Sequence, residues 1–166
     1  MWNEQIIMML LEGIKDTLYM TLTSTLIGYV IGLPMGILLT VTDKDGIHPN
    51  AAVYKVLDVI ANLIRSVPFL ILLIVLIPFT RFLIGRSYGP TATIVPLVIA
   101  AAPYIARMVE SSLKEVDAGV IEAARSMGAS NFTIVTKVML VEARTSLIVG
   151  ATISLGTILG YSAMAG

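Results

Sequence analysis

Four long runs of the 166-residue sequence contain no Asp, Glu, Lys or Arg. They are Thr17–Thr42, Ser66–Thr80, Ser87–Ala106 and Thr145–Gly166, with 26, 15, 20 and 22 residues. Together they make up half of the chain, and a soluble domain of this size has no core large enough to bury so much uncharged sequence. The sequence therefore predicts an all-α, polytopic integral membrane protein with a single transmembrane domain, residues 1–166.

About 20 apolar residues are needed to span the hydrocarbon core of a bilayer. The first, third and fourth runs are long enough to cross on their own. The second run, Ser66–Thr80, is shorter, so we expect its helix to extend to Val59 or to Ile84. Either extension includes an arginine, Arg65 or Arg81, whose long side chain can reach the headgroups from a helix end. The sequence thus predicts four transmembrane helices.

Basic residues predict how these helices are oriented, because cytoplasmic loops carry an excess of Lys and Arg. If the segment Arg107–Arg144 is cytoplasmic, eight basic residues lie inside and three lie outside. The inside set is Lys44, Lys55, Arg65, Arg107, Lys114, Arg125, Lys137 and Arg144, and the outside set is Lys15, Arg81 and Arg86. We therefore expect an external N-terminus.

Small residues recur at four-residue spacing in two of the expected helices. The sets are Gly28, Gly32 and Gly36 in the first helix, and the pairs Ser146 with Gly150 and Gly156 with Gly160 in the last. Such spacing lets helix backbones approach closely, so we expect two packing seams, although glycine is also simply frequent in membrane helices. Prolines that can kink helices lie in or beside the spans. They are Pro34, Pro68, Pro78, Pro96 and Pro103.

Composition excludes several functional classes. The net charge is zero and the chain has no cysteine, so neither a basic surface for nucleic acid nor a thiolate metal site is expected. An integral-membrane enzyme is an alternative, but its candidates, Asp58, Glu110 and His48, show no nucleophile–base spacing and no metal-ligand cluster. We expect no catalytic residue, metal ligand or cofactor in this chain, and we expect His48 to be solvated.

Two local ion pairs are expected from the spacing of charges. Arg65 follows Asp58 by seven residues on the same helical face, and Glu110 follows Arg107 by three.

The segment Arg107–Arg144 predicts two short helices separated by a glycine turn. Asp117 can cap the first helix, Gly128 suits a left-handed C-terminal cap, and Ser130 can cap the second helix. The first helix has one apolar stripe, formed by Val116, Val120, Ala123, Ala124 and Met127. The second has Val135, Val138 and Met139 along one side. A helix lying in the headgroup plane needs a basic face, which Arg125 alone does not supply, so we favour docking of the first helix on a cytoplasmic partner.

A resemblance to a known family rests on this segment and on further blocks of sequence. Glu122-Ala123-Ala124, followed by Gly128, Ile134 and Leu140, resembles the EAA signature of permease subunits in bacterial ATP-binding-cassette importers. Five other blocks resemble the methionine-importer permeases in particular. They are 31–34, 62–69, 77–81, 101–110 and 160–164, and they extend over nearly the whole chain in the family's order.

The resemblance implies a homodimeric permease in the bacterial inner membrane that translocates D- or L-methionine. It further implies a cytoplasmic ATPase subunit and an external substrate-binding lipoprotein as partners. The chain has no G-x-x-x-x-G-K-[ST] motif, so ATP would be bound by the partner subunit. A permease for another amino acid and a truncated, non-transporting membrane scaffold are the alternatives.

The resemblance also implies a role for Glu122, Ala123, Ala124 and Gly128, which would form the helix that couples to the ATPase. From the residues themselves, the candidates for the translocation pathway are Tyr161, Ser162, Met164, Arg65 and Ser66. Met164 could contact an apolar thioether substrate, and ordinary packing in the last helix is the alternative. The chain departs from the family at Val141 and Thr145, where prolines are usual, and it ends at Gly166, where the family continues into a fifth helix. We therefore expect four helices of a five-helix bundle.

Overall fold

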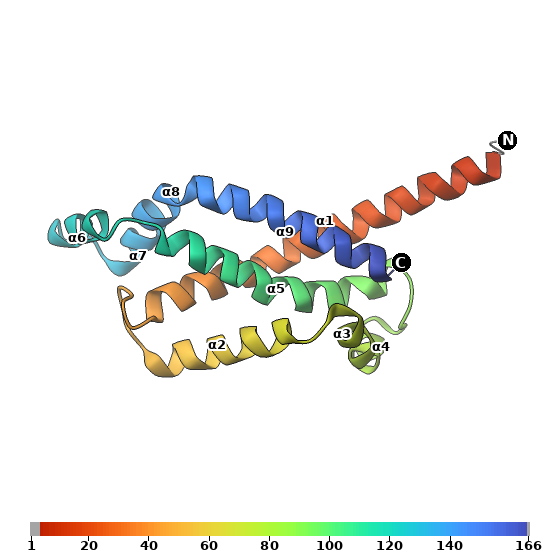
Figure 1. Ribbon diagram of the computed structural model, residues 1–166, viewed down its shortest axis with the longest axis horizontal. Helices are drawn as coiled ribbons and strands as arrows, with labels where there is room; N and C mark the ends of the chain where they lie inside the picture. The colour runs from red at the N-terminus through yellow and green to blue at the C-terminus, as the bar shows by residue number, and fades with distance from the viewer. Residues whose placement is uncertain (1–3, 166) are drawn as a thin grey trace.

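The computed structural model describes residues 4–165, and every regular element in this range is a helix. The elements are α1 (Glu4–Thr42), α2 (Ala51–Ser66), α3 (Phe69–Val75), α4 (Ile77–Ile84), α5 (Pro90–Lys114), α6 (Ala118–Ser126), α7 (Asn131–Thr133), the π-helix η1 (Ile134–Met139), α8 (Leu140–Glu142) and α9 (Arg144–Ala165). Gly166, the end of the last expected span, lies outside the described residues. Helices α1, α2 and α9 lie against α5, with α6–α8 at one end and α3–α4 at the other (Figure 1).

Among the described residues, three helices are long and apolar enough to cross a membrane, namely α1, α5 and α9. A fourth crossing exists only as the pair α2 and α3, which is bent by 102°. The expectation of one continuous helix through Ser66–Thr80 is therefore wrong. Pro68 disfavours helical geometry in the residue before it, and Val67 is accordingly extended, with φ −85° and ψ 124°. The chain resumes helical structure at Phe69.

Helix α5 forms the centre of the fold, and α1 packs against it through glycine. The expected seam in α1 is confirmed, because Gly28, Gly32 and Gly36 all face α5. A Cβ atom on Gly32 would lie 2.6 Å from the carbonyl oxygen of Ala102. One on Gly36 would lie 2.5 Å from that of Ala106. The two backbones are thus in direct contact, which only glycine at these positions permits.

Helix α9 packs through a different face from the one expected. Within residues 4–165, no atom beyond the helix backbone lies within 4 Å of a Cβ built on Gly156 or Gly160. The buried face of α9 instead consists of Gly150, Ser154, Ile158 and Ser162, at four-residue spacing. Ser146 donates a hydrogen bond to Ser112 of α5 over 3.0 Å. The glycine seam expected in α9 is therefore wrong for Gly156 and Gly160 within this chain, because no neighbouring helix among the described residues covers that face.

Several expected boundaries also shift. Helix α1 begins at Glu4 rather than near Thr17, and its first turns project beyond the bundle (Figure 1). Helix α5 continues past Ala106 to Lys114, so its last two turns belong to the same rod as the third expected span. Prolines do not interrupt these helices: α1 continues through Pro34, and α5 continues through two prolines.

Candidate functional site

The segment after α5 has the local structure that its capping residues predict. The carboxylate of Asp117 accepts hydrogen bonds from the backbone N–H groups of Gly119 (2.8 Å) and Val120 (3.3 Å), and so caps α6. Gly128 has φ +83° and ends the turn after α6, in the left-handed region where glycine is unstrained. The hydroxyl of Ser130 accepts from the backbone N–H of Thr133 at the start of α7. These three predictions are confirmed.

Part of the apolar stripe of α6 is buried against the rest of the molecule, and part of it is exposed. Ala124 is buried and Val116 is half-buried, whereas Val120 is 41% exposed and Met127 is 82% exposed. Ala123 is exposed as well. Because residues three and four apart lie on the same side of a helix, these three exposed residues form one outward surface. We name Val120, Ala123 and Met127 the outer α6 face.

The inner side of α6 rests on the second part of the segment. Ile134 and Met139 of η1 are buried, and Val135 and Val138 are half-buried. The expected apolar side of the second helix is therefore confirmed, although it lies mostly in a π-helical turn. The result is a small packed unit that holds α6 at the end of the bundle with one face free (Figure 1).

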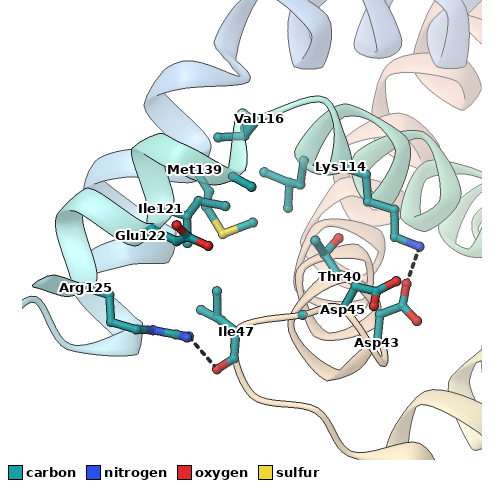
Figure 2. A pocket seen from close by; sticks show the side chains of 13 residues that line it. Thr40, Asp43, Asp45, Ile47, Lys114, Val116, Ile121, Glu122, Arg125 and Met139 are labelled. Atoms are coloured by element: carbon teal, nitrogen blue, oxygen red, sulfur yellow. Dashed lines mark hydrogen bonds and ion pairs between the residues drawn. The ribbon is translucent and has the colours of Figure 1, made fainter.

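A cavity of about 500 Å³ opens between α6 and the loop that follows α1. Figure 2 shows Ile121, Met139 and Val116 on its apolar side and charged groups around it. Glu122 of the EAA-like sequence borders this cavity. Arg125 donates a hydrogen bond of 2.9 Å to the carbonyl oxygen of Ile47 (Figure 2). The same loop that leaves α1 is therefore attached to α6.

A cluster of charged side chains lies beside this cavity. Arg107, Glu110 and Lys114 of α5 form it with Asp43, which follows α1, and Asp58 of α2. We name these five residues the α5 charge cluster. Glu110 is 5% exposed and pairs with Arg107 at 2.7 Å and with Lys114 at 2.8 Å. Lys114 also pairs with Asp43 at 2.7 Å. The hydrogen bond that the Lys114 ammonium donates holds the pKa of the Asp43 carboxyl below its ordinary value.

The cluster confirms one expected ion pair and corrects the other. Arg107 and Glu110 pair as expected. Asp58 does not pair with Arg65; its carboxylate binds Arg107, which also donates to Asn62 over 2.9 Å. The physical reason is that Asp58 faces α5, where Arg107 is largely enclosed, whereas Arg65 is exposed near the end of α2.

The sequence interpretation missed the contacts that join separate helices: Arg107 with Asp58, Lys114 with Asp43, and Arg125 with the loop. One signal was available. Arg107, Glu110 and Lys114 are three and four residues apart and so share one face of a helix. A charged face directly after an apolar span indicates that something polar lies opposite. In the part of the chain that the structure describes, no group of three or more His, Asp or Glu could hold a metal ion.

The pathway candidates lie toward the end of the molecule opposite α6. The ring of Tyr161 stacks on that of Phe69 with centroids 4.7 Å apart, which places the end of α9 beside α3. Ser162 is buried, with its hydroxyl 3.3 Å from that of Thr21. Met164 is 57% exposed. The remaining candidates, Arg65 and Ser66, are exposed where α2 ends.

Comparison with known proteins gives close relatives over almost the whole chain. The chain is 51% identical to the D-methionine transport system permease protein MetI of Salmonella typhimurium and to that of Escherichia coli. It is 44% identical to the probable MetI of Vibrio cholerae. The first two matches cover 99% of this chain and 76% of each relative.

Solved structures agree with these relatives. The fold matches inward-facing conformations of the MetNI methionine ABC transporter with a TM-score of 0.95 and 50% identity, over 98% of this chain and 76% of that chain. A crystal structure of an amino acid ABC transporter with histidines matches with a TM-score of 0.72 and 23% identity, over 99% of this chain and 76% of that chain. This second likeness supports the fold alone.

The family described as binding-protein-dependent transport system inner membrane component matches residues 7–166. That range includes all the candidate residues discussed above. Together with the apolar helices, it makes the protein a multi-pass membrane protein. The chain belongs to the family of binding-protein-dependent transport system inner membrane components.

Proposed function

We propose that this chain is the permease subunit of an ATP-binding-cassette importer that carries methionine into a bacterial cell. The observation that carries the proposal is α6: its inner side is anchored on the bundle while its outer face is apolar and exposed. A soluble partner with a groove would cover such a face, as amphipathic helices are commonly bound. The identity of 51% to D-methionine permeases supports methionine as the substrate.

In this proposal the chain does no chemistry itself. A separate ATPase subunit binds ATP and docks on the outer α6 face, with Ala123 in the contact. Glu122 and Gly128 flank that face, and the buried Ala124 packs α6 onto the bundle. Closure of that subunit moves α6, and the helices rock as rigid bodies between two arrangements. Two copies of the chain form the pathway, and an external binding protein delivers the substrate. The chain binds no cofactor of its own.

The proposed orientation follows from charge. The N-terminus lies outside and α6 lies in the cytoplasm, because this arrangement puts seven of the eleven basic residues on the α6 side. Arg65, which the sequence placed inside, lies instead in the last turn of α2, at the end of the molecule away from α6 (Figure 1). The attachment of α6 to the loop after α1 agrees with this orientation, since both then lie on the same side of the membrane.

The proposed pathway runs past the end of α9. Tyr161 and Met164 line it on α9, and Arg65 and Ser66 line it on α2, while the buried Ser162 holds α9 against Thr21 of α1. The thioether of Met164 is polarisable and exposed, and therefore suits contact with an apolar thioether substrate. The stacking of Tyr161 on Phe69 brings the α9 candidates next to the segment that follows Ser66.

The test is uptake of labelled methionine by cells that lack their own methionine importer. The cells express this chain with an ATPase subunit and a binding protein of such an importer. Met127→Glu places a charge on the outer α6 face and should abolish both uptake and co-purification of the ATPase subunit. Lys55→Glu is the matched control, because Lys55 is exposed on α2 and lies off that face, and it should leave both at the wild-type level.

Three results would overturn parts of the proposal. If another unlabelled amino acid inhibits the uptake of labelled methionine more strongly than unlabelled methionine does, the substrate is a different amino acid. Co-purification of the ATPase subunit without uptake of any amino acid would support the scaffold alternative. Unchanged uptake in Met127→Glu would remove α6 from coupling.

A further inference from the structure

Helix α2 is attached to the bundle in an unusual way for an apolar helix. Of its sixteen residues, only Ala61 is buried. Most of its large apolar side chains are exposed, with Val56 58% and Leu63 66% exposed, while Leu57 and Ile64 are half-buried. Apolar burial therefore contributes little to the position of α2 on α5.

Polar contacts fix that position instead. Arg107 binds the Asp58 carboxylate and the Asn62 side chain, both on α2. The hydroxyl of Tyr54 donates to Glu110 over 3.5 Å, and the ammonium of Lys114 lies 5.9 Å from the centre of the Tyr54 ring. In a bilayer no hydrophobic force drives helices together, so these contacts decide where α2 sits.

The same cluster is connected to α6 through the loop after α1. Arg125 of α6 holds the Ile47 carbonyl, and Asp43 at the start of the loop is held by Lys114 (Figure 2). The loop between them is hydrogen-bonded back onto α1. The backbone N–H groups of His48 and Asn50 donate to the carbonyls of Val41 and Thr42 at the end of α1.

The loop is also held by close contacts at both of its ends. A Cβ on Gly46 would lie 2.4 Å from the Val41 carbonyl oxygen, so the loop is folded tightly onto α1. At its other end the side chain of Asn50 accepts from the N–H of Val53 and caps α2. A movement of α6 is therefore passed to the loop and to Asp43, where the α5 charge cluster begins.

We infer that the α5 charge cluster is the connection through which a movement of α6 reaches α2, and that Arg107 and Glu110 are positioning residues in this connection. The inference rests on the proposed function, because only an ATP-driven partner would move α6. The enclosed Glu110 carboxylate stands between two cations, each of which has a second acidic partner on another element. If Asp58 or Asp43 moves away, its cation, Arg107 or Lys114, is left with Glu110 alone. The ion pairs of the whole cluster then rearrange, because an enclosed charge needs an oppositely charged partner.

The test uses the complete transporter in proteoliposomes, with ATPase subunit and binding protein. Asp58→Asn removes the charge at the α2 end without touching α6. We expect the number of methionine molecules imported per ATP hydrolysed to fall about tenfold, a typical size for a lost coupling interaction. Assembly with the ATPase subunit and hydrolysis without substrate should stay at the wild-type level. Asp58→Glu, which keeps the charge, should restore most of the import.

Two controls separate this role from a merely structural one. Lys55→Gln removes a charge from the exposed side of α2 and should change nothing. Arg125→Ala combined with Asp58→Asn should lower the import ratio no further than the more damaging single change, because both lie on one connection. Spin labels on α6 and α2 should report a distance change on adding ATP in wild type, and a smaller one in Asp58→Asn.

A parallel loss of assembly, hydrolysis and import in Asp58→Asn would overturn the inference in favour of a structural role. An unchanged import ratio would overturn it as well, while leaving the proposed function intact. If the wild-type complex binds no ATPase subunit and imports no amino acid, the proposed function fails first and this inference fails with it.

Discussion

Helix α5 meets its two neighbours α1 and α2 through opposite kinds of contact. Against α1 it packs backbone to backbone, with the carbonyl of Ala102 directly over Gly32. Against α2 it presents long charged side chains, and Arg107 reaches across to Asp58. Since membrane helices associate through close packing or through polar bonds rather than through hydrophobic burial, the two contacts are alternative solutions to one problem.

The difference lies in what each contact permits. A seam of touching backbones has one arrangement, because any shift produces overlap or a void. Long side chains can exchange partners within a few ångströms while remaining paired. We therefore expect α1 and α5 to move as one body and α2 to be able to move relative to them. The predictions below test each side of this comparison.

The largest effect is expected at the glycine seam. Gly32→Leu forces a side chain into the position of the Ala102 backbone and the Ile105 side chain. We expect destabilisation of about 4 kcal/mol or more, above the usual ~1–3 kcal/mol for overpacking because backbone atoms must move, or no folded protein at all. Gly156→Leu is the matched control on an open face. The measurement is unfolding of the detergent-solubilised subunit by circular dichroism in a titration with SDS.

Equal behaviour of the two leucine variants would contradict the description of α1 and α5 as one body. Since Gly156 has no neighbour within 4 Å among residues 4–165, its substitution should change the free energy of unfolding by less than about 1 kcal/mol. A large loss there would mean that α9 packs differently.

A smaller effect is expected at the charged contact. Arg107→Ala leaves Asp58 and the enclosed Glu110 without their shared cation, although Glu110 keeps Lys114. We expect a loss of about 3 kcal/mol, the lower end for breaking a buried ion pair. Arg86→Ala removes an exposed arginine and should have no measurable effect. The measurement is the same SDS titration. If Arg107→Ala lowers the free energy of unfolding no more than Arg86→Ala does, the charge cluster does not stabilise the fold.

The glycine patterns mark the limit of what the sequence could predict. Gly28-x-x-x-Gly32 and Gly156-x-x-x-Gly160 are identical as motifs, yet within residues 4–165 only the first is packed. Spacing determines which residues share a face of a helix, but a seam also needs a partner surface. For α1 that surface is supplied by α5 at Ala101. No local pattern states which helix covers which face.

In the candidate site, too, the sequence predicts the local features but not the contacts between helices. The caps at Asp117 and Ser130 depend on neighbours within three residues, and the sequence predicts them correctly. The partner of Asp58 is separated from it by 49 residues, and a seven-residue spacing wrongly favours Arg65 instead. Local geometry is encoded in short spacings, whereas pairing between helices follows from how the bundle closes.

A modest effect is expected in the third contact of the bundle, where α9 is held by hydroxyl groups. Ser162→Ala removes the contact with Thr21. Polar bonds between membrane helices contribute on average about 0.6 kcal/mol, so we expect a loss of this order. Thr152→Ala is the control, because that hydroxyl is exposed and bonds to the Ile148 carbonyl of its own helix. A loss in Ser162→Ala comparable with that at Gly32 would place α9 in the same body as α1 and α5.

The smallest effect is expected from pH, through Asp43 at the edge of the charge cluster. The Lys114 ammonium donates a hydrogen bond to this carboxylate and lowers its pKa below the ordinary value of 3.8. A carboxyl group with a lowered pKa stabilises the folded state above its unfolded pKa. That contribution is lost as the pH falls through the folded-state pKa. The contribution of Asp43 should therefore be constant from about pH 7 to 5 and should shrink below about pH 4.

The measurement is the difference in thermal stability between wild type and Asp43→Asn across this pH range, followed by circular dichroism. The substituted amide cannot ionise, so any pH-dependent part of the difference belongs to the carboxylate. Lys114→Gln should reduce that part strongly, because it removes the main group that lowers the pKa of Asp43, while the backbone N–H and the charge of Lys44 remain. A difference that grows on acidification would have the wrong sign for an ion pair. It would show that Lys114 does not hold Asp43 in the folded protein, and that the charged side of α5 ends at Glu110.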